Sequence, residues 1–181
     1  MSDPTVQAPG VAVDPGAVWR ALEELRPEVA RFCRNHLGDA ADAADAAQEA
    51  ILAAFEAIEG FRGAASLKTW VFRIAHKRCL DRVRTTLRRR TDLAASLDRH
   101  PATAAPVDER LASAQAAVVL HRVLADLPEV DRSILLLRFD HGMTFEDIGE
   151  ALGIRGDNAK VRAHRAIVRL RPKLRALGLD P

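Results

Sequence analysis

The sequence contains no tyrosine, and its only aromatic residues are two tryptophans and six phenylalanines among 181 residues. It has two cysteines, Cys33 and Cys79, which are too few for the disulfide framework of a small secreted domain. No apolar run approaches the roughly 20 residues of a membrane-spanning helix, and the N-terminus has no signal-peptide pattern. These absences predict a cytoplasmic protein without direct membrane insertion.

The common sequence signatures of enzymes are also missing. The chain has no glycine-rich phosphate-binding loop ending in lysine, no HExxH zinc-binding pair and no GxSxG nucleophile turn. Its aspartates and glutamates fall on predicted exposed helix faces instead of converging on one point. We therefore expect a protein that is not an enzyme and that uses no cofactor.

Alanine makes up 33 of the 181 residues and supplies much of the 48% apolar content. Because alanine favours helix and buries little surface, this composition predicts small helical bundles with thin cores. No segment alternates apolar and polar residues as a β-strand does. The expected fold class is all-α, with two small helical domains joined by a flexible linker.

Proline, glycine and capping residues divide the chain into helices. Residues 1–16 are expected to be a disordered tail, followed by a first domain at 17–88, a linker at 89–106 and a second domain at 107–181. The predicted helices span residues 18–37, 39–58, 66–88, 108–126, 129–140, 144–152 and 157–171.

Individual residues predict where these helices begin and end. Asp39, Ser66 and Thr144 are expected to cap the helices that follow them, and Gly153 to end the helix at 144–152. Pro27 predicts a break or restart within the first helix. Pro172 predicts a stop or a kink in the last helix.

Charge alternates in blocks along the chain, although the net charge is only +2. Residues 1–60 carry a net charge of −7, residues 61–100 one of +8, residues 101–150 one of −5 and residues 151–181 one of +6. The pattern of acid followed by base thus occurs once in each expected domain. It favours two modules, each with one face for a polyanion and another for a different partner.

Residues 144–171 have the proportions of a helix-turn-helix with a basic second helix. At about 100° per residue, one face of that helix is apolar and is predicted to be buried; it consists of Ala159, Ala163, Ala166, Ile167 and Leu170. The opposite face and its flanks consist of Lys160, Val161, Arg162, His164, Arg165, Val168, Arg169 and Arg171. Val161 suits a thymine methyl group and Arg165 a guanine edge, so this face is predicted to bind duplex DNA.

The helix that follows Ser66 and the loop before it combine aromatic and basic side chains. They are Phe61, Arg62, Trp70, Phe72, Arg73, Lys77 and Arg84. Aromatic rings stack on unstacked bases while basic groups neutralise the phosphates, so this mixture favours single-stranded nucleic acid over a duplex groove. The alternative is that Trp70, beside Leu67 and Ile74, belongs to the core.

Longer segments make a family resemblance specific. Between Asp42 and Arg84, the segments AAQE, FRG, SLKTW, RIA and CLDRVR resemble, in order and spacing, region 2 of the extracytoplasmic-function (ECF) sigma factors. Between Asp126 and Leu170, the segments DLP, ILLLR, TFEDIGEALG and KVRAHRA resemble region 4 of the same family. The family consists of two-domain helical initiation factors of bacterial RNA polymerase.

This resemblance implies a role for each surface of the chain. The residues implied in binding a melted −10 promoter element are Phe61, Arg62, Trp70, Phe72, Arg73, Lys77, Asp81 and Arg84. Those implied in binding a duplex −35 element are Asn158, Lys160, Val161, Arg162, His164, Arg165 and Arg169. Asp45, Gln48 and Glu49 resemble the surface that binds core polymerase, and the linker resembles the segment threaded through that enzyme.

The resemblance also implies an anti-sigma factor as a partner, in many members a membrane-anchored one, and a protein that associates with the nucleoid when active. Three alternatives stay open. Cys33, His36, His76 and Cys79 could form a metal or redox sensor, although two small hydrophobic cysteines are the simpler interpretation and we expect no metal. A sigma-like regulatory decoy would not need aligned basic residues. A simple helix-turn-helix repressor would not need the aromatic and basic first domain.

Overall fold

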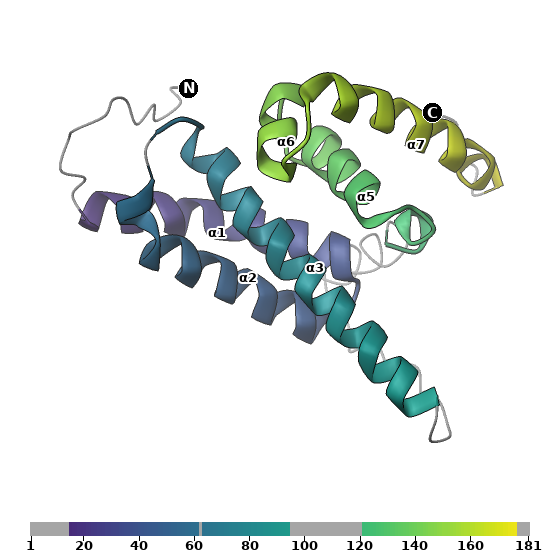
Figure 1. Ribbon diagram of the computed structural model, residues 1–181, viewed down its shortest axis with the longest axis horizontal. Coiled ribbons are helices and arrows are strands. Elements are labelled where there is room, and N and C mark those ends of the chain that lie inside the picture. The colour runs from purple at the N-terminus through teal and green to yellow at the C-terminus, as the bar shows by residue number, and fades with distance from the viewer. Residues whose placement is uncertain (1–14, 62, 95–120, 177–181) are drawn as a thin grey trace, which may run out of the picture.

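The computed structural model describes residues 15–61, 63–94 and 121–176, and every regular element within them is helical (Figure 1). This confirms the all-α prediction. The expected tail up to residue 14, Arg62, residues 95–106 of the expected linker and residues 107–120 of the expected second domain lie outside the described residues. Of the helix expected at 108–126, the described part is helical over residues 121–124.

The first half of the chain is a bundle of three helices, α1 (Pro15–Leu37), α2 (Ala40–Glu56) and α3 (Leu67–Ala94), with a 3₁₀ turn at Ile58–Gly60 after α2. The buried face of α2 is mostly alanine, which lets the neighbouring helices approach closely. It consists of Ala43, Ala46, Ala47, Ala50, Ile51 and Ala54. Larger side chains fill the space opposite, among them Leu22 and Phe32 of α1 and Phe72 of α3, all with no exposed surface.

The predicted caps of this bundle are confirmed. Asp39 Oδ1 accepts a hydrogen bond of 2.9 Å from the main-chain N–H of Asp42, at the start of α2. Ser66 Oγ accepts one of 3.0 Å from the main-chain N–H of Thr69, at the start of α3. Each cap satisfies a donor that has no partner inside its helix.

Three expectations are wrong: the break at Pro27, a stop at Pro172 and the end of the third helix at residue 88. The alternative of a kink at Pro172 stays a prediction. Helix α1 runs through Pro27 without a break, and α7 (Gly156–Ala176) runs through Pro172. Both prolines are exposed, so water can hydrate the carbonyl group that each leaves without an N–H partner. Helix α3 continues to Ala94, so the first six residues of the expected linker at 89–106 are helical.

The second half contains α5 (Glu129–Leu135), a π-helical turn η2 (Leu136–Asp140), α6 (Phe145–Leu152) and α7. Thr144 caps α6 by accepting from the main-chain N–H of Asp147 at 3.1 Å, as predicted. Gly153 ends α6 in the left-handed conformation, with φ of 70°. The turn between α6 and α7 is tight, because a Cβ atom at Gly149 would lie 2.7 Å from the carbonyl oxygen of Ile154.

The two halves pack directly on each other. Figure 1 shows α5, α6 and α7 lying on one side of the α1–α3 bundle. Contacts join α3 to α6 and α1 to η2, and the buried apolar residues of both halves form one continuous cluster. This contact positions the candidate functional surfaces described next.

Candidate nucleic-acid and polymerase interfaces

Helix α7 presents the two faces that the sequence predicts. Ala159, Ala163 and Ala166 are at most 2% exposed and pack in the core with Ile148 of α6. On the opposite side, Val161 is 48% exposed, although it is apolar. The exposed polar residues near it are Asn158, Lys160, His164, Arg165 and Arg169. An open, basic face with an apolar centre has the composition that major-groove readers use.

Arg162 differs from the other predicted DNA-binding residues of α7. Its Nε donates to Asp131 Oδ1 of α5 at 2.6 Å, and the Asp131 side chain is only 18% exposed. The pair joins α7 to α5. Arg162 therefore has a structural partner that the sequence prediction missed, because Asp131 lies 31 positions away.

On α3, the three predicted basic residues Arg73, Lys77 and Arg84 are all exposed. Trp70 is half-buried, and its ring lies 5.2 Å from the ring of Phe61, measured between centroids. Phe72 does not belong to this surface. Its side chain has no exposed area and packs edge-on against Phe32, with ring centroids 5.5 Å apart.

The last two predicted residues of this surface lie further along α3. Asp81 Oδ1 and Arg84 Nη1 are 3.5 Å apart, one helical turn from each other. Both side chains are about half exposed or more, at 47% for Asp81 and 68% for Arg84. Arg84 thus forms an ion pair with an acidic residue of its own helix. Arg73 and Lys77, which lie earlier in α3, instead face the second half of the chain.

Helix α6 covers part of the basic face of α3. Arg73 Nη2 donates to the main-chain oxygen of Glu150 at 2.9 Å and lies 3.6 Å from Glu150 Oε1. One turn away, Thr69 Oγ1 donates to Asp147 Oδ1 at 3.3 Å. A groove of about 750 Å³ remains between α2, α3 and α6, and Arg73 and Lys77 line it. Acidic groups of the second half thus occupy part of the surface predicted to bind DNA.

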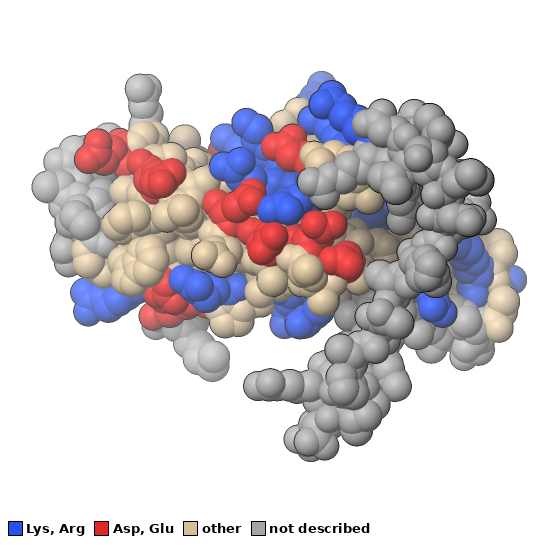
Figure 2. All heavy atoms as spheres, turned by 90° about the horizontal axis from the view of Figure 1, so that it is seen from below, with Lys and Arg blue, Asp and Glu red and all other residues tan. Residues whose placement is uncertain are grey.

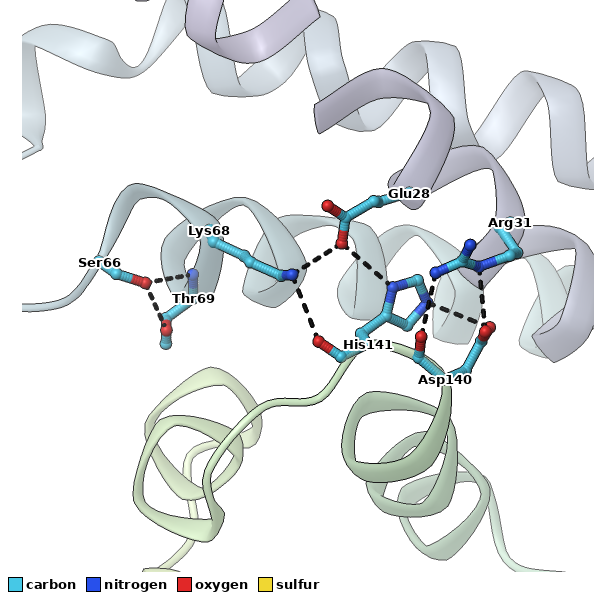
Figure 3. A network of polar contacts seen from close by, with 7 residues as sticks. All are labelled: Glu28, Arg31, Ser66, Lys68, Thr69, Asp140 and His141. Carbon is cyan, nitrogen blue, oxygen red and sulfur yellow. Dashed lines mark hydrogen bonds and ion pairs between the residues drawn. The ribbon is translucent and has the colours of Figure 1, made fainter. Parts of the chain in front are cut away.

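A second polar network joins the halves where η2 ends (Figure 3). Lys68 Nζ of α3 lies 2.8 Å from Glu28 Oε2 of α1 and donates to the main-chain oxygen of His141 at 3.3 Å. Arg31 of α1 contacts Asp140 twice, from Nε to Oδ1 and from Nη2 to the main-chain oxygen, both at 3.0 Å. Sequence reasoning missed all five residues, since the pairs are up to 113 positions apart.

The acidic face of α2 is predicted to bind core polymerase. Its side chains are exposed, but two of them form ion pairs with a basic residue of α3. The Asp45 side chain is 64% exposed and that of Glu49 is 47% exposed. Arg82 of α3 lies between them, 3.6 Å from Asp45 Oδ2 and 2.5 Å from Glu49 Oε1. Gln48 is exposed beside them. Figure 2, which views the molecule from below, shows acidic side chains directly beside basic ones on this face.

The four candidate metal ligands come together as two separate pairs. Cys33 Sγ and Cys79 Sγ are 3.6 Å apart in the core. His36 and His76 each lie 2.9 Å from the hydroxyl oxygen of Ser133, which is inserted between them from α5. Within the described ranges, no group of three or more His, Cys, Asp or Glu side chains is placed to hold a metal.

No helix in the described part of the chain combines the length and the apolar character that crossing a membrane requires.

Comparisons with known proteins assign both halves of the chain to one family. Residues 21–90 match Sigma-70 region 2, and residues 123–172 match Sigma-70 region 4. The chain is 32% identical over 180 residues to the ECF RNA polymerase sigma factor SigD of Mycobacterium tuberculosis, covering 96% of this chain and 84% of SigD. It is 34% identical over 108 residues to the ECF sigma factor ShbA of Streptomyces griseus, where the match spans 58% of this chain and 56% of ShbA.

Solved structures show the same fold at lower identity. One is the sigma factor RpoE in complex with the anti-sigma factor NepR from Bartonella quintana, with a TM-score of 0.69 and 22% identity over 88% of this chain and 97% of that one. Another is CnrH in complex with the cytosolic domain of CnrY, with a TM-score of 0.67 and 19% identity over 90% of both chains. The matches to Sigma-70 regions 2 and 4 define a transcription initiation factor. The chain belongs to the sigma-70 family, in its ECF group.

Proposed function

We propose that this chain binds bacterial core RNA polymerase, directs it to promoters with −10 and −35 elements, and helps to melt the DNA at the −10 element. The observation that carries the proposal is the exposed face of α7. There Val161 lies among Lys160 and Arg165, while the alanines of the opposite face are buried. A surface with an exposed apolar centre and basic flanks suits the −35 duplex, because it provides contacts to both bases and phosphates.

The −10 element is assigned to α3 and the loop before it. Flipping a base out of the duplex costs a few kcal/mol, and an aromatic surface such as Phe61 and Trp70 offsets that cost by stacking. Arg73 and Lys77 follow on exposed positions of the same helix, where they can neutralise the phosphates of the melted strand. Phe72 supports this surface from the core and does not contact DNA.

Core polymerase is assigned to the acidic face of α2. Asp45, Gln48 and Glu49 are exposed together there. The negative charge of Asp45 and Glu49 attracts a basic protein surface and repels DNA. Arg82 holds the two carboxylates in place from α3, at 3.6 Å and 2.5 Å.

The proposed function requires the two halves to separate. In the closed arrangement, Arg73 is bound to Glu150 and Thr69 to Asp147, so the second half competes with DNA for the −10 surface. When the halves separate, DNA phosphates can take the place of Glu150 and Asp147 on α3. Separation also allows α3 and α7 to reach two promoter elements at once.

Reconstituted transcription tests the proposal. We expect the purified chain with bacterial core polymerase to initiate at a two-element promoter, and the chain alone to bind duplex DNA weakly. A chain that does not bind core polymerase would overturn the proposal. Strong duplex binding without polymerase would instead favour a simple repressor, and polymerase binding without initiation would favour a decoy.

We also propose an anti-sigma factor as a partner, and a location in the cytoplasm, on the nucleoid when the chain is active. The relative RpoE was solved with its anti-sigma factor NepR. In this chain, the groove of about 750 Å³ between α2, α3 and α6 is lined by apolar residues and by three basic ones, Arg73, Lys77 and Arg78, against one acidic one, Glu150. A segment with both apolar and acidic side chains suits it. A protein that binds the chain, blocks reconstituted transcription and loses affinity when Lys77 is replaced by Glu would support this partner. Unchanged affinity in that variant would contradict the groove as its site.

A further inference from the structure

Three helices from both halves meet at a buried group of polar side chains. His36 lies near the end of α1, His76 in α3 and Ser133 in α5. His36 and Ser133 have no exposed surface, and His76 is 7% exposed. His36 Nε2 and His76 Nδ1 each lie 2.9 Å from Ser133 Oγ. One hydroxyl group therefore joins two helices of the first half to the second half.

Only a few arrangements of hydrogens on Ser133 and the two imidazoles satisfy this contact. A hydroxyl group donates once and accepts through two lone pairs, so at most one imidazole can accept from Ser133 and at least one must donate to its oxygen. Nδ1 of His36 is buried and has no hydrogen-bond partner among the described residues, so a proton on that atom would stay unpaired. The favoured pattern has Nε2 of His36 donating to Ser133, and Ser133 donating to Nδ1 of His76, with both rings neutral.

An added proton on either ring disrupts this pattern. On His36 it would occupy the buried Nδ1, where no acceptor is present among the described residues. On His76 it would occupy Nδ1, which would then point at the hydroxyl proton of Ser133. The closed contact therefore favours neutral imidazoles, because a proton added to His36 would leave a buried donor unpaired and one added to His76 would remove the bond that Ser133 donates.

The charged groups around the pair reinforce this preference. Arg132 of α5 is 5% exposed and donates from Nη1 to the main-chain oxygen of His36 at 2.9 Å, so a positive charge already lies beside the ring. Glu129 favours a charged ring, through its main chain and through Oε2 at 3.7 Å from His36 Nε2, but Oε2 lies closer to Arg132 Nη1, at 3.3 Å, and burial and Arg132 outweigh it. The other titratable groups nearby are His121, Cys33 and Cys79.

These surroundings shift both pKa values in one direction. Burial lowers the pKa of His36 to about 3, with a contribution from Arg132, and burial lowers the pKa of His76 to about 4. An exposed histidine titrates near pH 6.5. The contact therefore contributes its full stability above about pH 6.5 and loses it as the pH falls towards 4. Over that range, each imidazole reduces the ratio of closed to open chain by up to about tenfold per pH unit.

We propose that His36, Ser133 and His76 form an acid-sensitive latch, which holds the second half against the α1–α3 bundle while both imidazoles are neutral and releases it when they take up protons. Release separates α6 from α3 and uncovers Arg73. The latch is a property of the folded chain alone. It can therefore be tested without DNA or polymerase, and its failure would not contradict the proposed function.

Small-angle X-ray scattering of the full chain between pH 7.5 and 4 tests the latch, with circular dichroism recorded on the same samples. We expect the radius of gyration to increase as the pH falls below 6.5 while the helical signal is retained. A wild-type chain that stays compact down to pH 4 would overturn the proposal. Loss of helix together with the expansion would also overturn it, because that result indicates unfolding instead of opening.

Isosteric variants separate the latch from other titrating groups. His36→Gln places an amide nitrogen where Nε2 lies, and His76→Asn places an amide oxygen where Nδ1 lies, so both can keep the bonds to Ser133 without titrating. We expect the double variant to stay compact over the whole range. His164→Gln, on the exposed face of α7, serves as the control and should expand like the wild type. If the radius of gyration of the double variant increases with the same pH midpoint as that of the wild type, the latch is contradicted.

Nuclear magnetic resonance titration of the imidazoles in the wild-type chain gives a test that needs no variant. We expect His36 and His76 to stay neutral until the scattering shows expansion. If His36 and His76 take up protons near pH 6.5 while the chain remains compact, the closed contact tolerates charged imidazoles and the proposal is wrong.

Discussion

Arg132 of α5 donates a hydrogen bond of 2.9 Å from Nη1 to the main-chain oxygen of His36, near the end of α1. The same guanidinium group donates to the main-chain oxygens of Leu124 at 3.3 Å and Ala125 at 3.1 Å. One side chain thus satisfies carbonyl groups in both halves of the molecule. Such carbonyl groups near a helix end have no partner inside the helix and need an external donor.

Replacing Arg132 by Met should therefore reduce the free energy of unfolding by about 3 kcal/mol. The carbonyl groups lose their donor, two of them, those of His36 and Leu124, in buried hydrogen bonds. Each buried group left unpaired costs about 1–3 kcal/mol. Chemical denaturation measures the effect. Arg122→Met, at an exposed position within the helical residues 121–124, is the matched control and should cost less than about 0.5 kcal/mol. Equal effects at both positions would contradict the bridging role of Arg132.

Two arginines three positions apart on α7 should behave differently. Arg165 is exposed, so Arg165→Ala should leave stability unchanged and weaken −35 recognition by about 1–3 kcal/mol, the value of a good base contact. Arg162 is bound to Asp131 at 2.6 Å, so Arg162→Ala should lower stability by about 1–2 kcal/mol.

Binding of the holoenzyme to promoters with intact and altered −35 elements measures the first effect, and thermal denaturation measures the second. The altered element should abolish the difference between Arg165→Ala and the wild type. If Arg165→Ala weakens binding equally with both elements, its contact is with phosphate and not with a base.

Trp70 should act at a later step than Arg165. Its ring is half-buried beside Phe61, near the start of α3. We expect Trp70→Ala to leave the closed promoter complex intact and to impair opening, because a flipped base loses a stacking surface worth about 1–3 kcal/mol. Permanganate footprinting detects the opened bases.

The other tryptophan provides the control for Trp70. Trp19 packs edge-on against Phe55, with ring centroids 5.0 Å apart, in the α1–α2 part of the bundle. Trp19→Ala should lower stability without a specific defect in promoter opening. If both variants fail at the same step, Trp70 has a structural role only.

Features that depend on neighbouring residues could be predicted from the sequence. Asp39, Ser66 and Thr144 cap their helices as predicted, because each cap joins residues three positions apart. The two faces of α7 follow from helical periodicity, which places Ala159 in the core and Val161 outside. The prediction at Pro27 is wrong because the effect of a proline depends on which face of α1 is exposed, and that is a property of the tertiary structure.

Features of the contact between the halves could not be predicted in this way. Ser133 meets His36 across 97 positions and His76 across 57 positions. The sequence pattern does indicate that Cys33, His36, His76 and Cys79 could converge, since each pair lies one turn apart on its helix. It carries no sign that a serine from the second half separates the imidazoles. Phe72 is buried because it lies about 100° around α3 from Arg73 and so faces α1.

Glycine substitutions provide the sharpest test of the closed arrangement. Gly38, between α1 and α2, has φ of 77°, and a Cβ atom there would lie 2.4 Å from Cδ2 of His121 in the second half. Gly63 has a similar φ of 68°, but a Cβ atom there would have no described atom within 4 Å. Alanine at either position incurs the left-handed backbone cost of about 1–2 kcal/mol. Only Gly38→Ala must also displace His121, so it should lower stability by more than Gly63→Ala and increase the radius of gyration at pH 7.5. If the two variants are equally compact and equally stable, His121 does not pack on Gly38 in solution, and the halves are not held in the closed arrangement.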